Sequence, residues 1–252
     1  MAISHRGSRF LWPENSSKAF AEALGLGFRH IETDLHLTAD GVLVCFHDHL
    51  LYRTTGEAGL VSERTFDELG RLDAGFRHDR GTTFPFRDQG VTIPSLEEVL
   101  TTHPEVTIVV DLKEDGLEAP LARLIEDLRV AQRLIVGSFH DRRLREFRRL
   151  TNGTVPTSTS PRETMAMIAA SRRGRPISSD AAALLVPTHW WGLRVVDDRL
   201  VDSAHLAGMQ IHVWTVNTVN EMNRLLDLGV DGLITDRPDL AKTTLQQRGL
   251  WR

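Results

Sequence analysis

Short apolar runs alternate with segments of helical spacing along most of the 252 residues of the chain. In the first helical segment, apolar residues recur at helical spacing between residues 19 and 24, and the pattern stops at Gly25, which is typical of a helix that ends at glycine. Strands that alternate with helices indicate βα units and a parallel sheet. About eight such units in a chain of this length predict a (β/α)8 barrel, formed as a single domain over residues 1–252. The predicted strands cover residues 2–5, 30–36, 42–47, 107–112, 134–138, 155–159, 183–186, 211–216 and 232–235.

Residues 52–93 interrupt this alternation. The stretch is long and rich in glycine, arginine and threonine, and we expect an insertion over one rim of the barrel, after the third predicted strand. The regular pattern resumes at Ser95, because Ser95 and Glu98 have the spacing of a capping box that begins a helix.

The composition excludes several classes of function. Apolar residues make up 41% and charged residues 25%, as in an ordinary globular chain, and the net charge is −4. A general polyanion binder needs an excess of basic residues, so nucleic acid is not expected as a partner. The sequence contains neither an apolar run of about 20 residues, as a membrane span requires, nor a visible secretory leader. We therefore expect a soluble, cytoplasmic protein in which the single cysteine, Cys45, is a buried apolar residue.

Acidic residues lie near the ends of two predicted strands, where barrels of this kind carry their chemistry. Glu32 and Asp34 are two residues apart in a strand, so their side chains share a face. Neighbouring carboxylates repel each other unless a cation is bound, and the hard cations Mg²⁺ and Ca²⁺ prefer oxygen ligands. Asp111 ends a later apolar strand and is a candidate third ligand. The alternative is a solvated acidic pair without a metal.

Basic residues near other strand ends suit a phosphate group. Lys113 follows Asp111 by two residues and shares its face, either to hold an anionic oxygen beside the metal or to form a simple ion pair. His5 and His47 both lie at the ends of apolar strands, and two histidines can serve as general base and general acid in one reaction. Arg6, next to His5, is a fixed fork of donors that fits phosphate.

The turn at residues 40–41 leaves two arrangements open for the strand that precedes His47. If the turn closes a hairpin, Asp34 lies opposite His47 and Glu32 opposite His49. If the two strands are parallel neighbours in the barrel, both still end at the same rim. Either arrangement places His47 near the carboxylates.

His47 and His49 also have the H-x-H spacing found in zinc hydrolases. The spacing follows the third predicted strand rather than the first, and no distant group of histidines supports it. A zinc site is therefore the less favoured interpretation.

The motifs of the chain, in the order in which they occur, resemble those of the glycerophosphodiester phosphodiesterase family. The resemblance runs from residue 4 to about residue 240, and the motifs are specific as a set. They are His5-Arg6-Gly7, Pro13-Glu14-Asn15-Ser16, Glu32-Thr33-Asp34, Thr38-Ala39-Asp40-Gly41, His47-Asp48, Arg53-Thr54-Thr55, residues 93–100, Asp111-Leu112-Lys113, and residues 213–217, 229–232 and 235–238.

The resemblance implies a TIM barrel with a divalent metal, usually Mg²⁺ or Ca²⁺, that hydrolyses a glycerophosphodiester to glycerol 3-phosphate and an alcohol. It also implies that the glycerol 2-hydroxyl attacks first and gives a cyclic phosphate, which water then opens. His5 and His47 match the catalytic pair. Arg6 and Lys113 match phosphate contacts of the family. The matches to its metal ligands are Glu32, Asp34 and Asp111. Trp214 matches an aromatic residue at the glycerol end of the substrate.

One position departs from the family and keeps two alternatives open. Asp111 stands where the family usually has glutamate, so the metal must lie nearer to that strand or be reached through water. Sphingomyelinase D, a relative with the same barrel, pairs Glu-x-Asp with Asp-x-Lys, which makes a phospholipase D-type enzyme acting on lysophospholipid or sphingolipid the first alternative. Against it, Cys45 alone cannot form the disulfide of that group. The second alternative is a barrel that binds a phosphorylated ligand without turning it over.

No motif specifies the alcohol. The 52–93 insertion and the later loops would select it, and Phe139, Trp190 and Trp191 are candidates for an apolar wall, for core residues or for oligomer contacts. An exposed aromatic patch at the mouth of the site would favour a lysophospholipid over a water-soluble diester.

Overall fold

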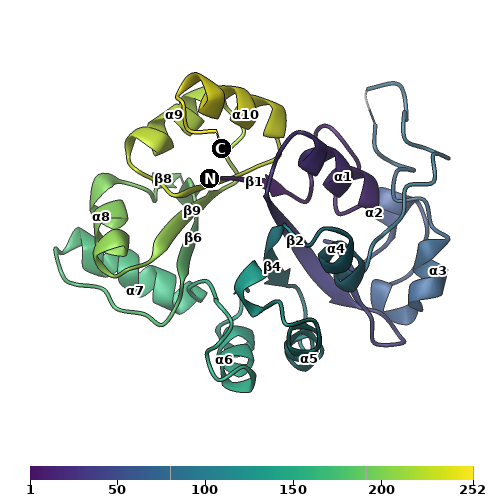
Figure 1. The fold of residues 1–252 in the computed structure, drawn as a ribbon, viewed down its shortest axis with the longest axis horizontal. Helices are drawn as coiled ribbons and strands as arrows, with labels where there is room; N and C mark the ends of the chain where they lie inside the picture. The colour runs from purple at the N-terminus through teal and green to yellow at the C-terminus, as the bar shows by residue number, and fades with distance from the viewer. Residues whose placement is uncertain (80, 191, 252) are drawn as a thin grey trace.

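Parallel strands form the wall of a barrel, as the alternation in the sequence predicts (Figure 1). The computed structural model describes residues 1–79, 81–190 and 192–251. The strands follow one another around the wall in the order β5, β4, β2, β1, β10, β9, β6. Their bounds are β1 (Ala2–His5), β2 (His30–Leu37), β4 (Thr107–Leu112), β5 (Leu134–Gly137), β6 (Ala183–Pro187), β9 (Gln210–Trp214) and β10 (Gly232–Thr235).

The predicted strand 155–159 contributes two bridge residues instead of a full strand. Thr157 forms a parallel bridge with Val136 of β5, and Ser158 forms one with Ala183 of β6. These bridges fill the gap between β5 and β6, so this segment takes the eighth place in the wall.

Helices cover the outside of the wall (Figure 1). Ser95 and Glu98 form the predicted capping box at the start of the helix that precedes β4. Fully buried residues such as Phe20, Leu121 and Phe147 fill the layer between helices and strands, and burial of each contributes about 1.5–3 kcal/mol. Within the described residues, no helix is both long and apolar enough to cross a membrane. The helices of this layer are α1 (Ser17–Gly25), α4 (Leu96–Thr102), α5 (Glu118–Leu128), α6 (Asp141–Leu150), α7 (Pro161–Arg172), α8 (Asp198–Leu206), α9 (Val219–Asp227) and α10 (Pro238–Gln247), with the short η2 (Ala131–Arg133) before β5.

The strand before His47 forms a hairpin with β2, in a register one residue away from the predicted one. β3 (Leu43–Cys45) pairs antiparallel with β2, and the backbone N–H of Phe46 donates to the carbonyl of Asp34 at 2.9 Å. Asp34 therefore lies opposite Phe46 and not opposite His47. The reason is the loop, because the N–H of Thr38 donates to the carbonyl of Val42 at 3.0 Å and closes a three-residue turn, whereas the prediction assumed two residues.

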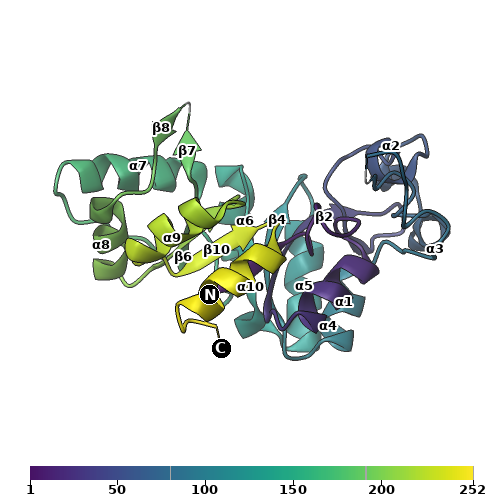
Figure 2. The same cartoon turned by 90° about the horizontal axis from the view of Figure 1, so that it is seen from above.

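The 52–93 stretch packs around a small apolar cluster that it shares with β3. It contains α2 (Tyr52–Thr55), η1 (Val61–Glu63) and α3 (Phe66–Gly70). The buried members of the cluster are Val44, Phe46, Leu51, Val61, Leu69, Ala74, Val91 and Ile93. Figure 2 shows the part of this stretch around α2 on the same side of the barrel as the small hairpin of β7 (His189–Trp190) and β8 (Leu193–Arg194).

An apolar floor closes the inside of the barrel below its C-terminal rim. Ile3, Val109 and Ile234 are buried there, and Leu185 and Trp214 pack against them. Above this floor, the strand ends carry the polar residues that the sequence singles out.

Candidate active site

His5, at the end of β1, is oriented by a carboxylate from the other end of the chain. Its Nδ1 lies 2.6 Å from Oδ1 of Asp236, whose Oδ2 accepts a hydrogen bond from Asn217 at 3.0 Å. With the Nδ1 proton directed to Asp236, Nε2 remains for the pocket, 3.6 Å from Oε2 of Glu32. Burial alone would lower the pKa of His5, but the charge of Glu32 and the hydrogen bond with Asp236 outweigh it and raise that pKa.

His47 has a carboxylate partner of its own. Its Nδ1 lies 2.5 Å from Oδ1 of Asp48, and Nη2 of Arg53 donates to the same oxygen at 3.2 Å. The side chain is 33% exposed, so Nε2 remains available on the pocket side of the ring. Partial burial lowers the pKa of His47, although the charge of Asp34 works in the opposite direction.

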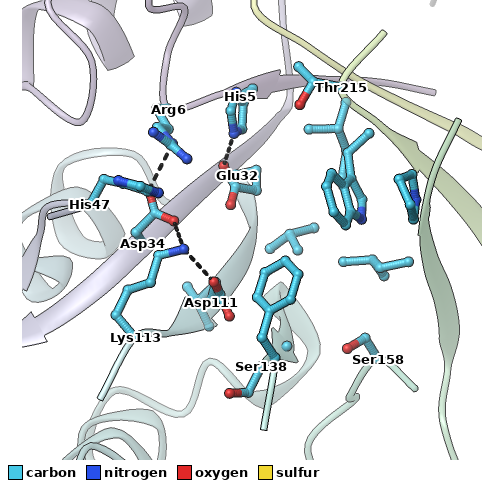
Figure 3. A pocket seen from close by; sticks show the side chains of 18 of the residues that line it. His5, Arg6, Glu32, Asp34, His47, Asp111, Lys113, Ser138, Ser158 and Thr215 are labelled. Carbon is cyan, nitrogen blue, oxygen red and sulfur yellow. Dashed lines mark hydrogen bonds and ion pairs between the residues drawn. The ribbon is translucent and has the colours of Figure 1, made fainter. Parts of the chain in front are cut away.

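The three predicted metal ligands line the same pocket (Figure 3). Glu32 and Asp34 belong to β2, and the parallel register with β4 sets Asp34 beside Asp111. Oε2 of Glu32 is buried and has no hydrogen-bond partner within the described part of the chain. Burial and the charge of Asp34 raise the pKa of Glu32 to about 7. A carboxylate in this environment requires either a proton or a nearby cation.

Two basic side chains contact these carboxylates. Nζ of Lys113 lies 2.8 Å from Oδ1 of Asp34 and 2.6 Å from Oδ2 of Asp111, and Nε of Arg6 lies 2.9 Å from Oδ2 of Asp34. Burial would raise the pKa of Asp34, but the two cations hold it below its ordinary value. Lys113 thus bridges Asp34 and Asp111. Among the described residues, the ligand atoms of Glu32, Asp34 and Asp111 do not all lie within 4.8 Å of one another.

The backbone after His5 explains why glycine follows Arg6. Arg6 and Gly7 have φ angles of 53° and 77°, in the left-handed region that favours glycine. A Cβ atom on Gly7 would lie 2.6 Å from Cβ of Ala19, which is too close for any side chain. This turn lets the backbone N–H of Arg6 donate to the carbonyl of Glu32 at 2.8 Å and directs its guanidinium toward Asp34.

Glu14 connects Arg6 to the surroundings of His47. Its Oε1 accepts from Arg6 at 3.0 Å and from Arg53 at 2.8 Å, and its Oε2 accepts from Arg53 at 2.9 Å. Arg53 in turn donates to Asp48, the partner of His47. Burial would raise the pKa of Glu14, but the two guanidinium groups lower it to about 2.

This shift predicts a pH-dependent loss of stability in Glu14→Gln. A carboxyl whose folded-state pKa lies below its ordinary value stabilises the fold above that ordinary value, and the effect disappears as the pH falls through the folded-state pKa. We expect the free energy of unfolding of Glu14→Gln to be lower by up to about 3 kcal/mol at pH 7. The deficit should shrink between pH 4.5 and pH 2.

Urea unfolding at pH 7 and near pH 3 measures this difference. Glu22→Gln is the matched control, because Glu22 pairs with Lys18 on the exposed face of α1, and an exposed pair contributes less than about 1 kcal/mol. An equal deficit of Glu14→Gln at both pH values would contradict the prediction.

The pocket has a charged side and an apolar side, and its volume is about 810 Å³. On the apolar side, the rings of Phe139 and Trp214 meet edge to face at 5.6 Å. Phe139 is 61% exposed and Trp190 is 38% exposed, and both line the pocket. Trp191, the third aromatic candidate, lies outside the described residues. Nζ of Lys113 lies 5.6 Å from the Phe139 ring centroid, where the two sides meet.

The structure brings every predicted site residue into this one pocket: His5, Arg6, Glu32, Asp34, His47, Asp111, Lys113 and Trp214. Five supporting residues were given no role from the sequence, although each lies in one of the matched motifs: Glu14, Asp48, Arg53, Asn217 and Asp236. For Glu14, Asn217 and Asp236, spacing to the histidines carries no signal, because their contacts depend on how distant segments fold together.

Comparisons with known proteins agree with this geometry. The model of the glycerophosphoryl diester phosphodiesterase family matches residues 5–240. The chain is 35% identical to the Mycobacterium tuberculosis protein named probable glycerophosphodiester phosphodiesterase 2, over 100% of this chain and 92% of that protein. It is 33% identical to the glycerophosphodiester phosphodiesterase of Bacillus altitudinis, over 95% of each.

A solved structure shares the fold. The glycerophosphoryl diester phosphodiesterase domain of a Mycobacterium tuberculosis protein matches with a TM-score of 0.85 at 22% identity, over 98% of each chain. The predicted barrel and the predicted enzyme class are thereby confirmed. The chain belongs to the glycerophosphoryl diester phosphodiesterase family.

Proposed function

We propose that this protein, as one domain over residues 1–252, hydrolyses a glycerophosphodiester to glycerol 3-phosphate and an alcohol. The observation that carries the proposal is the pairing of two histidines with two carboxylates at one pocket. His5 is held by Asp236 and His47 by Asp48, each through Nδ1. Each ring therefore keeps Nε2 for proton transfer. One histidine takes the proton of the attacking hydroxyl, and the other protonates the leaving alcohol.

The basic residues of the pocket suit the phosphate group. The guanidinium of Arg6 and the ammonium of Lys113 both lie within 3 Å of Asp34 oxygens, so they are held in place before substrate arrives. Fixed cations stabilise the charge that develops on phosphate oxygens, without reorganisation during the reaction. Trp214, on the apolar side, would face the glycerol end of the substrate.

The donor set fits a hard divalent cation. Oε2 of Glu32 is buried without a hydrogen-bond partner among the described residues, and the pKa of that carboxyl is raised, so a cation beside it would be stabilising. Glu32, Asp34 and Asp111 would hold Mg²⁺ or Ca²⁺, which prefer carboxylate oxygens. When bound, such an ion neutralises charge on the phosphate. Lys113 also places a positive charge between Asp34 and Asp111.

Product analysis tests the proposal. Glycerophosphocholine incubated with the protein and Mg²⁺ should yield glycerol 3-phosphate and choline, measured by enzymatic assay or by ³¹P resonance. Glycerol and phosphocholine would show cleavage on the other side of the phosphorus. Binding without any product would support the non-catalytic barrel and overturn the proposal.

Lysophospholipids are the second candidate substrates, because of one observation. Phe139 and Trp190 are exposed at the pocket, and exposed aromatic groups suit an acyl chain. A panel of water-soluble diesters and lysophosphatidylcholine, compared by kcat/KM, decides between them.

A further inference from the structure

A second group of metal-ligand side chains lies outside the pocket. His36 is the residue two positions after Asp34 on β2, His49 follows β3, and Glu114 follows β4. Within the described residues, this is the group of three whose ligand atoms all lie within 4.8 Å of one another. None of the three residues lines the pocket that holds the predicted catalytic residues.

The distances from Glu114 to the two histidines fit a small tetrahedral ion, and the third separation is below 4.8 Å. Oε2 of Glu114 lies 3.4 Å from Nδ1 of His36 and 3.6 Å from Nδ1 of His49. Two ligands of a tetrahedral Zn²⁺, each about 2.0–2.1 Å from the ion, lie roughly 3.3–3.4 Å apart. The two measured separations are therefore close to the edges of a zinc coordination tetrahedron.

Hydrogen bonds with backbone groups orient two of the three side chains, His36 and Glu114. Nε2 of His36 lies 3.1 Å from the carbonyl oxygen of His47, so Nε2 donates its proton there and Nδ1 is directed toward Glu114, where a neutral ring would offer its lone pair to an ion. The other oxygen of Glu114, Oε1, accepts from the backbone N–H of Leu37 at 2.8 Å. Metal-binding histidines and carboxylates characteristically have such partners, which fix the tautomer and the ring orientation.

We propose that His36, His49 and Glu114 bind one Zn²⁺ ion, in a site separate from the carboxylates of the active site. Two imidazole nitrogens and one carboxylate oxygen form a ligand set typical of zinc. His36 is 1% exposed and His49 is 62% exposed, so the fourth position faces solvent on the His49 side. The ion would join three chain segments: the end of β2, the His47–His49 loop and the loop after β4. It would hold the backbone of the His47 loop in place through His36.

Metal binding to variants of the full-length protein tests the site without an activity assay. Chelator-treated protein is mixed with Zn²⁺ or Co²⁺ in the presence of excess Mg²⁺, which fills the oxygen site. Wild type should bind one equivalent of zinc and show the strong visible absorption of four-coordinate cobalt. His49→Ala and Glu114→Gln should weaken zinc binding by at least about 100-fold, beyond the loss expected from an outer partner.

Both variants should keep the fold. The His49 side chain is mostly exposed, and glutamine at position 114 can still accept the hydrogen bond from Leu37. His103→Ala, in a histidine at the end of α4, is the matched control and should bind zinc like wild type. Zinc should raise the melting temperature of wild type and His103→Ala but not that of His49→Ala, because an ion that binds only the folded state stabilises it.

Three outcomes would overturn the site. Wild type binds no zinc, or His49→Ala and Glu114→Gln bind it as tightly as wild type, or the cobalt complex shows no four-coordinate spectrum. In each case the three side chains form only an ion-paired cluster. A protein that fails every phosphodiesterase assay can still give the expected zinc result, so the two proposals fail separately.

Discussion

Replacing His47 by alanine is expected to lower kcat/KM for glycerophosphocholine by about 10³-fold, within the 10²–10⁴-fold range of a lost general acid or base. The reason is geometric. Asp48 fixes the Nδ1 side of the ring at 2.5 Å, so Nε2 is the atom left to exchange a proton with substrate. His5, the other proposed proton-transfer residue, is held by Asp236 at a different strand end, so we do not expect it to take over this function.

The fold should survive this substitution, because the His47 side chain is 33% exposed and its removal leaves no sealed cavity. Circular dichroism and the urea midpoint verify this for each variant. His103→Ala is the control for losing an imidazole far from the rim, and its kcat/KM should match wild type. If His47→Ala retains wild-type turnover, His47 takes no part in the reaction and the two-histidine mechanism is wrong.

The side-chain placements that the sequence could predict depend on spacing along single strands. Residues two apart on a strand share a face, so the pairs Glu32 with Asp34 and Asp111 with Lys113 could be placed on one face each from the sequence. The strand order then brings the two pairs together, because β2 and β4 are neighbours in the wall. Spacing along the strands could therefore place these four residues at one rim.

Contacts between distant segments could not be predicted in the same way. Asp236 meets His5 across a separation of 231 residues, and no local pattern marks Asp236 as the partner. The hairpin register was missed for a smaller reason. Whether the turn contains two or three residues is decided by the bond between Thr38 and Val42, and a shift of one residue replaced His47 by Phe46 opposite Asp34.

His47 and His49, the two histidines of the H-x-H spacing, show how contacts between segments and the hairpin decide what a local pattern cannot. Their spacing is that of zinc hydrolases, and no distant group of histidines in the sequence supports a site. In the fold, His47 turns to Asp48, while His49 meets His36 across the hairpin, with ring centroids 4.8 Å apart. The supporting histidine comes from β2, and only the folded hairpin brings it there.

Removing divalent metal is expected to lower turnover of glycerophosphocholine by about 10²–10³-fold. A bound metal contributes several kcal/mol of charge stabilisation at a phosphoryl oxygen, and each 1.36 kcal/mol is tenfold in rate. The measurement is the initial rate after EDTA treatment and gel filtration, followed by titration with Mg²⁺ or Ca²⁺. Restoration by either ion in the absence of zinc assigns the effect to the oxygen ligands, because the His36–His49–Glu114 set prefers a softer metal.

Glu32→Gln tests whether these oxygen ligands are the ones proposed. The substitution removes one negative charge at the atom that is buried without a hydrogen-bond partner, and it keeps the volume and the fold. We expect Glu32→Gln to need at least tenfold more Mg²⁺ for half-maximal rate, because a neutral amide is a poorer ligand than a carboxylate for a hard cation. Glu114→Gln, the same change at the separate zinc site, should leave the Mg²⁺ requirement unaltered. Full activity of wild type after chelation would show that Lys113 and Arg6 alone supply the positive charge, and Asp34 and Asp111 would then serve only to hold those two cations.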